Sequence, residues 1–185
     1  TSSTLIVSDA ADLAAIGKLM RDNPDALADK TVNIVKDIDM SVYTWVPMNY
    51  KNYNKTLTIN GNGHTIKGLN SEGAVTYYGE YAGAFIGRLD SWTDVTVNNL
   101  TFEGTQKVHA VGNVYTYVSG IMASGGDLNQ VTNKIDTVID GTTGYTVIQG
   151  GMSYNASSMT NCVAAGTTTL ENVSLKSYSY YGLSD

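Results

Sequence analysis

Several residue types are scarce in this chain, and each scarcity narrows the class of protein. Cys162 is the only cysteine among 185 residues, so the chain has no internal disulfide and no metal motif of spaced cysteines. No apolar run approaches the ~18 residues of a membrane span. Only two arginines occur, and the net charge is −6. Nucleic acids and anionic membranes require a basic face, so we expect neither as a partner and no membrane insertion.

The abundant residue types are those of β-proteins outside the cell. Threonine, serine, asparagine, glycine and tyrosine are frequent in an acidic chain, a composition typical of bacterial extracellular β-proteins. The length suits a single domain, residues 1–185, with one sizeable core. The stretch 177–185 carries no obvious cap, which is compatible with a fragment of a longer surface protein. Cys162 lies in an expected strand, so we expect a buried thiol rather than a nucleophile.

The first element is expected to be a helix over residues 9–21, with a break at Pro24. Ser8 can cap this helix, and Asp9 and Asp12 lie where the positive helix end favours carboxylates. Its apolar residues recur at helical spacing: Leu13, Ile16, Leu19 and Met20. A single apolar stripe must pack on something, so we expect residues 1–30 to form a segment that caps the first coil of the β region.

From residue 31 onward, short β-branched runs alternate with glycine and asparagine. Pro47 is the only proline in this part, so almost nothing interrupts a ladder of paired strands. We expect strands over residues 32–35, 57–59, 65–69, 82–86, 95–102, 115–122, 137–139, 145–148, 159–163 and 169–175.

The stretch Leu57–Leu69 is compatible with two architectures. Its centre, residues 60–63, reads Asn-Gly-Asn-Gly, and both residue types tolerate a positive φ, so the backbone can turn tightly there. One solution is a two-stranded hairpin. The other is a corner of a solenoid, after which the chain lays down its next short strand. Weak repeats favour the solenoid, because a glycine shortly precedes Phe85, Met122 and Met152 at unequal spacings that suit coils with variable loops.

The order of the motifs resembles a known family. After the segment 9–20, the motifs are Asp37-Ile38-Asp39-Met40, Trp45-Val46-Pro47-Met48, Gly61-Asn62-Gly63-His64-Thr65-Ile66 and Val97-Asn98-Asn99-Leu100-Thr101-Phe102. Over residues 9–104 the chain resembles the right-handed parallel β-helix proteins of bacterial surfaces in the pectate-lyase-like superfamily, including adhesin-like members with GLUG repeats from gut anaerobes. The resemblance implies an all-β fold, a single-stranded right-handed parallel β-helix over residues 31–185 with an N-terminal capping α-helix.

One pair of carboxylates is a candidate metal site. Asp37 and Asp39 lie one residue apart in an expected strand, so they project to the same face. With Asp9 or Asp12 nearby they could bind Ca²⁺, which takes several oxygen ligands. Turn capping or simple solvation of the two carboxylates is the alternative, and we favour it.

For the residues that could be catalytic, the sequence supports structural roles better than catalytic ones. His64 could be catalytic, but it stands in a structural signature of the family that the chain resembles. A lyase of that superfamily would pair a Ca²⁺ carboxylate cluster with a basic residue, and Arg88 beside Asp90 and Asp94 is the candidate; a surface ion pair is the favoured alternative. A hydrolase would need two facing carboxylates. Candidates for these are Glu103, Asp136, Asp140 and Glu171. We therefore name no catalytic residue.

Tyrosine is the one enriched residue type that is suited to ligand binding, with 13 residues. Aromatic faces with a polar edge suit carbohydrate stacking and protein interfaces, although tyrosine is also a good strand residue. The favoured ligand-binding candidates flank the turn region: Tyr50, Tyr53, Tyr77, Tyr78 and Tyr81.

Together these features favour a non-enzymatic, extracellular or cell-surface, adhesin-like module of a bacterium that binds a glycan or a host or bacterial surface protein. Two alternatives stay open: a polysaccharide lyase or glycoside hydrolase of the β-helix superfamily, and a structural spacer. An enzyme predicts a groove where Arg88 or a histidine lies within hydrogen-bond reach of two or more carboxylates. A binding module predicts exposed tyrosines without that cluster, and a spacer predicts neither.

Overall fold

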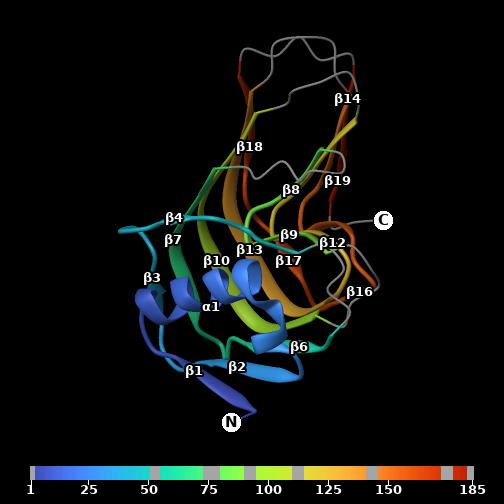
Figure 1. Cartoon of the computed structure of the whole chain (residues 1–185). Helices are drawn as coiled ribbons and strands as arrows, with labels where there is room; N and C mark the ends of the chain where they lie inside the picture. Colours follow the sequence, from blue (N-terminus) through green and yellow to red (C-terminus); the bar gives the residue numbers. More distant parts are fainter. Residues whose placement is uncertain are drawn as a thin grey trace.

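The computed structural model describes residues 3–50, 55–72, 80–89, 95–109, 115–140, 146–171 and 177–182, and most of them lie in β-strands (Figure 1). The strands form three sheets, called here A, B and C. Sheet A contains β1 (Thr4–Val7), β2 (Lys30–Ile34), β3 (Ile38–Asp39), β4 (Thr44–Trp45), β6 (Leu57–Asn60), β7 (Thr65–Glu72), β10 (Val95–His109), β13 (Asp127–Asp140), β16 (Ser158–Thr160), β17 (Val163–Ala164) and β18 (Thr168–Glu171). Sheet B contains β5 (Met48–Tyr50), β9 (Ile86–Leu89), β12 (Met122–Ser124) and β15 (Ser153–Asn155). Sheet C contains β8 (Glu80–Gly83), β11 (Tyr115–Ser119), β14 (Thr146–Gly150) and β19 (Ser177–Tyr181).

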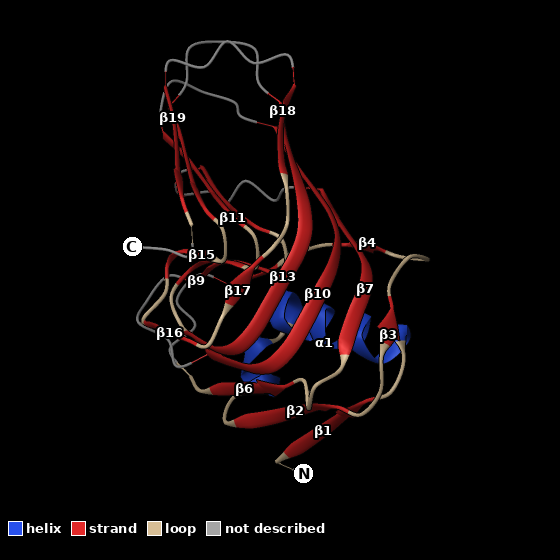
Figure 2. Cartoon of the chain, turned by 180° about the vertical axis from the view of Figure 1, so that it is seen from behind, coloured by secondary structure: helices blue, strands red, loops and turns tan. Residues whose placement is uncertain are grey.

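The chain visits the three sheets in a fixed order. It passes from sheet C to sheet B to sheet A in β8, β9 and β10, again in β11, β12 and β13, and again in β14, β15 and β16. All described pairings are parallel. Figure 2 shows the two longest strands, β10 and β13, running side by side. The expectation of an all-β fold is confirmed, with parallel sheets.

The stretch Leu57–Leu69 forms a corner, and the hairpin alternative is wrong. Strands β6 and β7 both pair with β10 and not with each other. At the corner the Gly61 amide donates to the Asn98 carbonyl at 2.7 Å. A Cβ on Gly61 would lie 2.3 Å from the Asn99 carbonyl oxygen, so only glycine allows this approach. Asn62 and Gly63 then turn the chain with φ of 52° and 81°.

Asparagines repeat at this corner on successive strands. The Asn60 side-chain amide donates to Asn33 at 3.2 Å, and the Asn98 amide donates to Asn60 at 3.0 Å. The amides therefore form a ladder across β2, β6 and β10. Asn99 and Gln130 stand at the next position of β10 and β13, and both have a positive φ, 47° and 55°. The two strands consequently bend at the same level and stay in register.

The helix α1 (Ala10–Asp22) occupies nearly the expected residues, and the 3₁₀ helix η1 (Pro24–Leu27) follows it. Its N-cap is Asp9, whose carboxylate accepts from the Asp12 amide at 2.9 Å. The expected Ser8 cap is wrong. Ser8 donates its own amide and hydroxyl to the Asp12 carboxylate, at 2.8 and 2.9 Å, and so fixes the entry to the helix.

The apolar stripe of α1 packs against β1 and β5, which are the first strands of sheets A and B. Leu13, Ile16 and Met20 are buried there, as their helical spacing predicts. The strand β1 precedes the helix and has no counterpart among the expected strands. It is too short to show a period of two in the sequence by itself.

Stacked aromatic rings fill the centre of the core. The Trp45 and Phe85 rings stack with centroids 5.3 Å apart, and the Phe85 and Phe102 centroids are 4.8 Å apart. The Trp45 indole N–H donates to the Phe85 carbonyl at 3.2 Å, which satisfies its one polar atom. Phe85 and Leu100 are 0% and 1% exposed, so both side chains point into the core.

Three expected strands are split: residues 159–163 are divided between β16 and β17, and the other two are each split by a corner between sheets. Residues 82–86 fall partly in β8 and partly in β9, and residues 115–122 divide between β11 and β12. Between the halves, Phe85 and Ile121 are fully buried, and the Phe85 amide donates to the Ile121 carbonyl at 3.0 Å. The chain therefore turns from sheet C to sheet B while its side chains stay in the core, and an apolar run can conceal such a turn.

Candidate functional site

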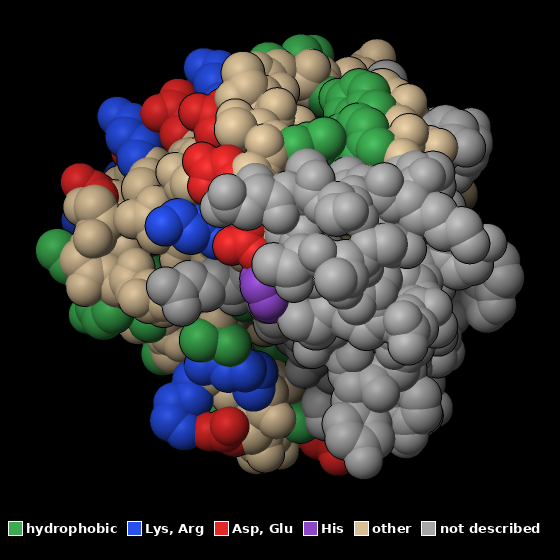
Figure 3. All heavy atoms as spheres, turned by 90° about the horizontal axis from the view of Figure 1, so that it is seen from above, with side chains coloured by type: hydrophobic (Ala, Val, Ile, Leu, Met, Phe, Trp, Pro, Cys, Tyr) green, Lys and Arg blue, Asp and Glu red, His purple; other side chains and the backbone are tan. Residues whose placement is uncertain are grey.

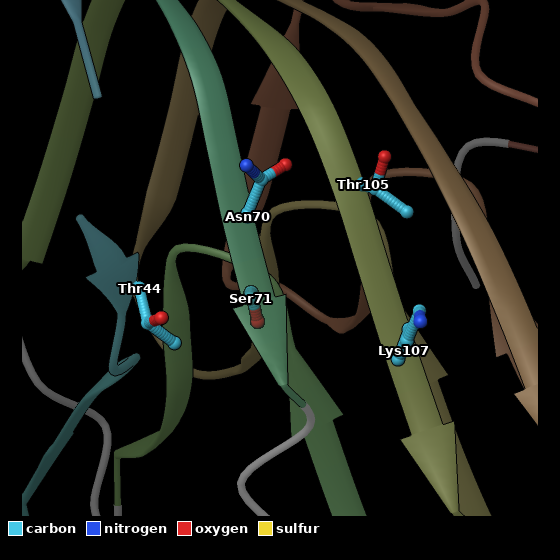
Figure 4. A pocket seen from close by; sticks show the side chains of 5 residues that line it. All are labelled: Thr44, Asn70, Ser71, Thr105 and Lys107. Carbon is cyan, nitrogen blue, oxygen red and sulfur yellow. The ribbon is translucent and has the colours of Figure 1, made fainter. Parts of the chain in front are cut away.

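A polar groove lies at the edge of sheet A, where β4, β7 and β10 run side by side (Figure 4). It has a volume of about 300 Å³ and is lined by Thr44, Asn70, Ser71, Thr105 and Lys107. The register sets Thr44 opposite Asn70 and Asn70 opposite Thr105, so polar side chains form a row across three strands. Lys107 follows on the same face of β10, because it is two residues beyond Thr105.

Buried and exposed side chains alternate along β7 and β10, and this alternation places polar side chains in the groove. Leu69 and Gln106 are buried, whereas Asn70 and Lys107 are exposed and Thr105 is half-buried. In a strand, successive side chains point to opposite faces, so the residues beside the buried ones face outward. Four of the five lining residues thus belong to the outer face of sheet A, whereas Ser71 is 2% exposed and lies in the inward row with Trp45 and Gln106.

Lys107 is the one charged residue among those that line the groove, and its ammonium group is positive. Two other lysines on sheet A are paired: Lys134 lies 3.4 Å from Glu103, and Lys67 lies 3.9 Å from Asp37. Within the described part of the chain, Lys107 has no such acidic partner. The register sets Lys107 opposite Glu72 on β7, whose side chain lies outside the described part of the structure.

Asp37 and His64 form a second polar cluster on the outer side of sheet A. The Asp37 carboxylate accepts from the Thr65 amide at 3.0 Å, and it lies 3.4 Å from His64 Nδ1. The Thr65 amide, followed by His64 and Lys67, holds the pKa of Asp37 below its usual value. These contacts give His64 a structural partner across the corner.

Asp39 lies opposite Lys67 in the register of β3 and β7. Hydrogen bonds from the Ser41 hydroxyl and amide lower the pKa of Asp39. The surroundings of Asp37 and Asp39 are thus a lysine, a histidine and amide donors, which differ from the set of oxygen ligands that Ca²⁺ takes. No group of three or more His, Cys, Asp or Glu side chains that could hold a metal occurs among the described residues. A calcium site at this pair stays a prediction.

Three of the four other carboxylates considered for catalysis have local partners, and the fourth, Glu171, is exposed on β18. Glu103 pairs with Lys134, and Asp140 pairs with His109 on the neighbouring strand. The Asp136 carboxylate accepts from the amide and hydroxyl of Thr167, at 2.9 and 2.6 Å, which lowers the pKa of Asp136. Each of these three partnered carboxylates therefore bridges two neighbouring segments of the chain.

The tyrosine candidates fall largely outside the described residues. Tyr53, Tyr77 and Tyr78 lie outside them, as do Asp90 and Asp94 beside the Arg88 candidate. Tyr50 and Tyr81 lie in β5 and β8, where only their backbone is described. The described tyrosine nearest in sequence to the groove is Tyr43, which is 40% exposed and directly precedes Thr44. These tyrosines remain binding candidates.

Sequence reasoning did not select the groove residues. Thr44, Asn70 and Thr105 come from non-consecutive strands, so only the register of three strands brings them together. The one available signal was polar residues at alternate positions beside buried ones, as in Thr105 and Lys107. That signal marks every residue on the outer face of a strand, and it does not identify the residues that come together in the groove.

The described surface carries mixed charge. Figure 3 shows lysine or arginine and aspartate or glutamate side chains interspersed over the part seen from above. No helix among the described residues is long and apolar enough to cross a bilayer.

The comparison with known proteins identifies one family. Residues 24–124 match the family model described as "Putative pectate lyase-like adhesive domain". This segment covers more than half of the chain and includes all the groove residues. No curated protein and no solved structure matches the chain.

Proposed function

The chain belongs to the family of pectate lyase-like adhesive domains, and we propose that it is an adhesin-like module that binds a polysaccharide in the groove on sheet A. The three sheets, visited in turn, are the faces of a right-handed parallel β-helix in this proposal. Its place is the bacterial surface or the extracellular space, where an adhesive domain meets its ligand.

The observation that carries the proposal is the chemistry of the groove. Thr44 and Thr105 offer hydroxyl groups, Asn70 offers an amide donor and acceptor, and Lys107 offers three ammonium donors. Sugar hydroxyls both donate and accept, so a row that alternates these functions across neighbouring strands suits a chain of sugar units. Tyr43, which directly precedes Thr44 and is 40% exposed, is the described aromatic residue nearest in sequence to the row.

A glycan array screened with the purified domain tests this function. Asn70→Ala combined with Lys107→Ala should weaken binding to the recognised polysaccharide at least about tenfold, because both polar anchors of the groove are lost. Lys18→Ala on the exposed face of α1 is the matched control and should bind as the parent does. Equal binding by the groove variant would place the ligand elsewhere.

An absorbance assay for unsaturated products on the same polysaccharides separates binding from catalysis. The adhesin-like proposal expects binding with no product. Product formation would favour the lyase alternative and direct attention to Arg88. If the array detects no glycan while the domain still attaches to whole cells, the result would favour a surface protein as the ligand.

A further inference from the structure

The polar row of the groove continues beyond β10. Thr105 lies opposite Asp136 in the register of β10 and β13, and the Thr167 amide donates to the Asp136 carboxylate at 2.9 Å. Asp136 and Thr167 are exposed, and Asp136 stands between the buried Ile135 and Thr137, so it belongs to the outer face of sheet A. We call the polar side chains of these five neighbouring segments the outer row: Thr44, Asn70, Thr105, Asp136 and Thr167.

The outer row runs across the strands rather than along them. Figure 2 shows β7, β10 and β13, which carry its three central residues, side by side. Neighbouring strands lie about 4.8 Å apart, so the whole row extends over about 19 Å. A linear polysaccharide that lies across the strands would meet one polar side chain at each of them. The row therefore suits a chain of several sugar units better than a single sugar.

Asp136 is held in place with one carboxylate oxygen left as an acceptor. The amide and the hydroxyl of Thr167 both donate to its Oδ1 atom, at 2.9 and 2.6 Å. Within the described part of the chain, its Oδ2 atom has no hydrogen bond. The bond from the Thr167 hydroxyl, followed by that from the amide, lowers the pKa of Asp136, so the carboxylate is ionised near neutral pH. Sugar hydroxyls donate hydrogen bonds, and an ionised carboxylate is a strong acceptor for them.

The charge beneath the outer row disfavours an acidic ligand. On β10 and β13 four carboxylates accompany two lysines, and all six residues project to the outer face: Glu103, Asp127, Asp136, Asp140, Lys107 and Lys134. Lys134 lies 3.4 Å from Glu103, and the register sets Lys107 opposite Glu72. These two strands are therefore net negative, as the whole chain is. A carboxylated or sulfated polymer would bring like charge to Asp136, whereas an uncharged polymer would not.

We propose that the ligand is a neutral, linear polysaccharide that lies across the strands of sheet A, and that Asp136 and Thr167 bind it together with the groove residues. The inference rests on the function proposed for the groove and narrows its ligand from polysaccharides in general to uncharged ones. The Asp136 carboxylate has two effects in this arrangement. It accepts hydrogen bonds from sugar hydroxyls, and it repels polymers that carry acidic groups.

Calorimetric titrations with matched pairs of polymers test the selection by charge. Each pair consists of a neutral glucan, galactan or mannan and the same polymer with its primary hydroxyls oxidised to carboxylates. In about 0.1 M salt the parent chain should bind the best neutral polymer at least about tenfold more tightly than its oxidised form. The ratio should shrink in about 1 M salt, because salt screens the repulsion. Equal or tighter binding of the oxidised form would overturn the proposal.

Substitutions of Asp136 test its two effects separately. Asp136→Ala should weaken binding of the neutral polymer at least about tenfold, because the acceptor is lost. Asp136→Asn should bring the affinities for the two polymers of a pair closer together, because the charge is lost and a hydrogen-bonding side chain remains. Asp127→Ala and Asp127→Asn are the matched controls, since Asp127 lies on the same strand and accepts from the Ser158 hydroxyl at 2.8 Å. At full extension it is about 30 Å from Asp136, beyond the screening length of about 10 Å in about 0.1 M salt, so both controls should behave as the parent does.

Oligosaccharides of the best neutral polymer, from the disaccharide to the hexasaccharide, test the extent of the site. Affinity should rise until the oligosaccharide covers the outer row, and a disaccharide that binds as tightly as the hexasaccharide would overturn the extended site.

Thermal melts show whether the Asp136 variants fold, and the titrations of the parent chain with matched polymers do not depend on them. Unchanged affinities in folded Asp136 variants would overturn the role of the outer row. If the parent prefers acidic polymers and Asn70→Ala with Lys107→Ala still weakens binding, the groove function stands and the neutral ligand is wrong. If the parent binds no polysaccharide, both proposals are wrong.

Discussion

At the scale of single residues, close approaches between backbone segments decide which residue type a position accepts. Gly61 and Gly63 illustrate this, because they stand two residues apart in one corner and are required for different reasons. Gly61 has no room for a Cβ, which would meet the Asn99 carbonyl oxygen and the Leu100 side chain at 2.3 and 2.5 Å. Gly63 has space for a Cβ, with only the side-chain Nδ2 of Asn99 3.9 Å away, but its φ is +81°.

Gly61→Ala should therefore be the more damaging of the two changes. We expect it to lower the free energy of unfolding by about 3 kcal/mol or more, as overpacking against rigid backbone does. Gly63→Ala should cost about 1–2 kcal/mol, the conformational cost of a left-handed alanine. Urea denaturation of both variants measures the order, and equal losses would contradict the steric explanation.

Phe85 tests the assignment of the core. Phe85→Ala should cost about 3–5 kcal/mol because it removes a fully buried ring from between Trp45 and Phe102. Phe85→Asp should leave the chain unfolded, since it buries an unpaired charge. Val42→Ala, at a highly exposed residue, is the control and should change stability by less than about 0.5 kcal/mol. Circular dichroism melts compare the three, and an unchanged melting temperature in Phe85→Asp would show that the ring does not face the core.

At the scale of elements, the sequence predicted those with a clear period and missed those without one. The helix was expected over 9–21 and occupies Ala10–Asp22, because a 3.6-residue apolar stripe ends at Pro24. The corner at residues 60–63 was identified from its turn residues. The breaks at Phe85 and Ile121 were not, because buried corner residues look like strand residues in sequence. The long extensions of β10 and β13 depend on pairing with each other, which a local pattern does not contain.

The cap of α1 offers a test at this scale. Asp9→Ala should cost about 1 kcal/mol, because it removes the acceptor for the Asp12 amide at the helix end. Ser8→Ala should cost less, because the Ser8 backbone amide still donates to the Asp12 carboxylate after its hydroxyl is gone. Thermal unfolding of the two variants side by side measures the difference, and a larger loss in Ser8→Ala would reverse the assignment of the cap.

At the scale of the whole molecule, the sequence predicted a single all-β chain and an adhesive family, but it did not predict the place of the groove. A site built from Thr44, Asn70 and Thr105 requires the alignment of three strands that are far apart in the sequence. The tyrosine candidates came from composition, which contains no such alignment. Architecture follows from repeated local patterns here, whereas the site follows from register between strands.

Acid sensitivity is a property of the whole molecule as well. Local hydrogen bonds and charges lower the pKa of five carboxylates. These residues are Asp12, Asp22, Asp37, Asp39 and Asp136. A folded-state pKa below the unfolded value contributes stability above about pH 4, and that stability is lost as pH falls through the folded pKa.

We therefore expect the melting temperature to be steady near neutral pH and to fall below about pH 4. Asp37→Asn should flatten this fall, because its hydrogen bond with the Thr65 amide no longer depends on a titrating group. Calorimetry from pH 7 to about pH 2.5 measures both curves. A melting temperature that does not change over the acidic part of the range would contradict the expectation.

The two ends of the three sheets differ because α1 covers only one of them, and this difference has a mechanical consequence. Among the described residues, the outermost strands at both ends have a single neighbour in their sheet, but α1 packs against β1 and β5 at one end. A force applied to an adhesive domain through its C-terminal end would meet one ladder of hydrogen bonds at a time. The domain should then peel strand by strand from that end and yield gradually, and the layer beneath α1 should be the last to give way.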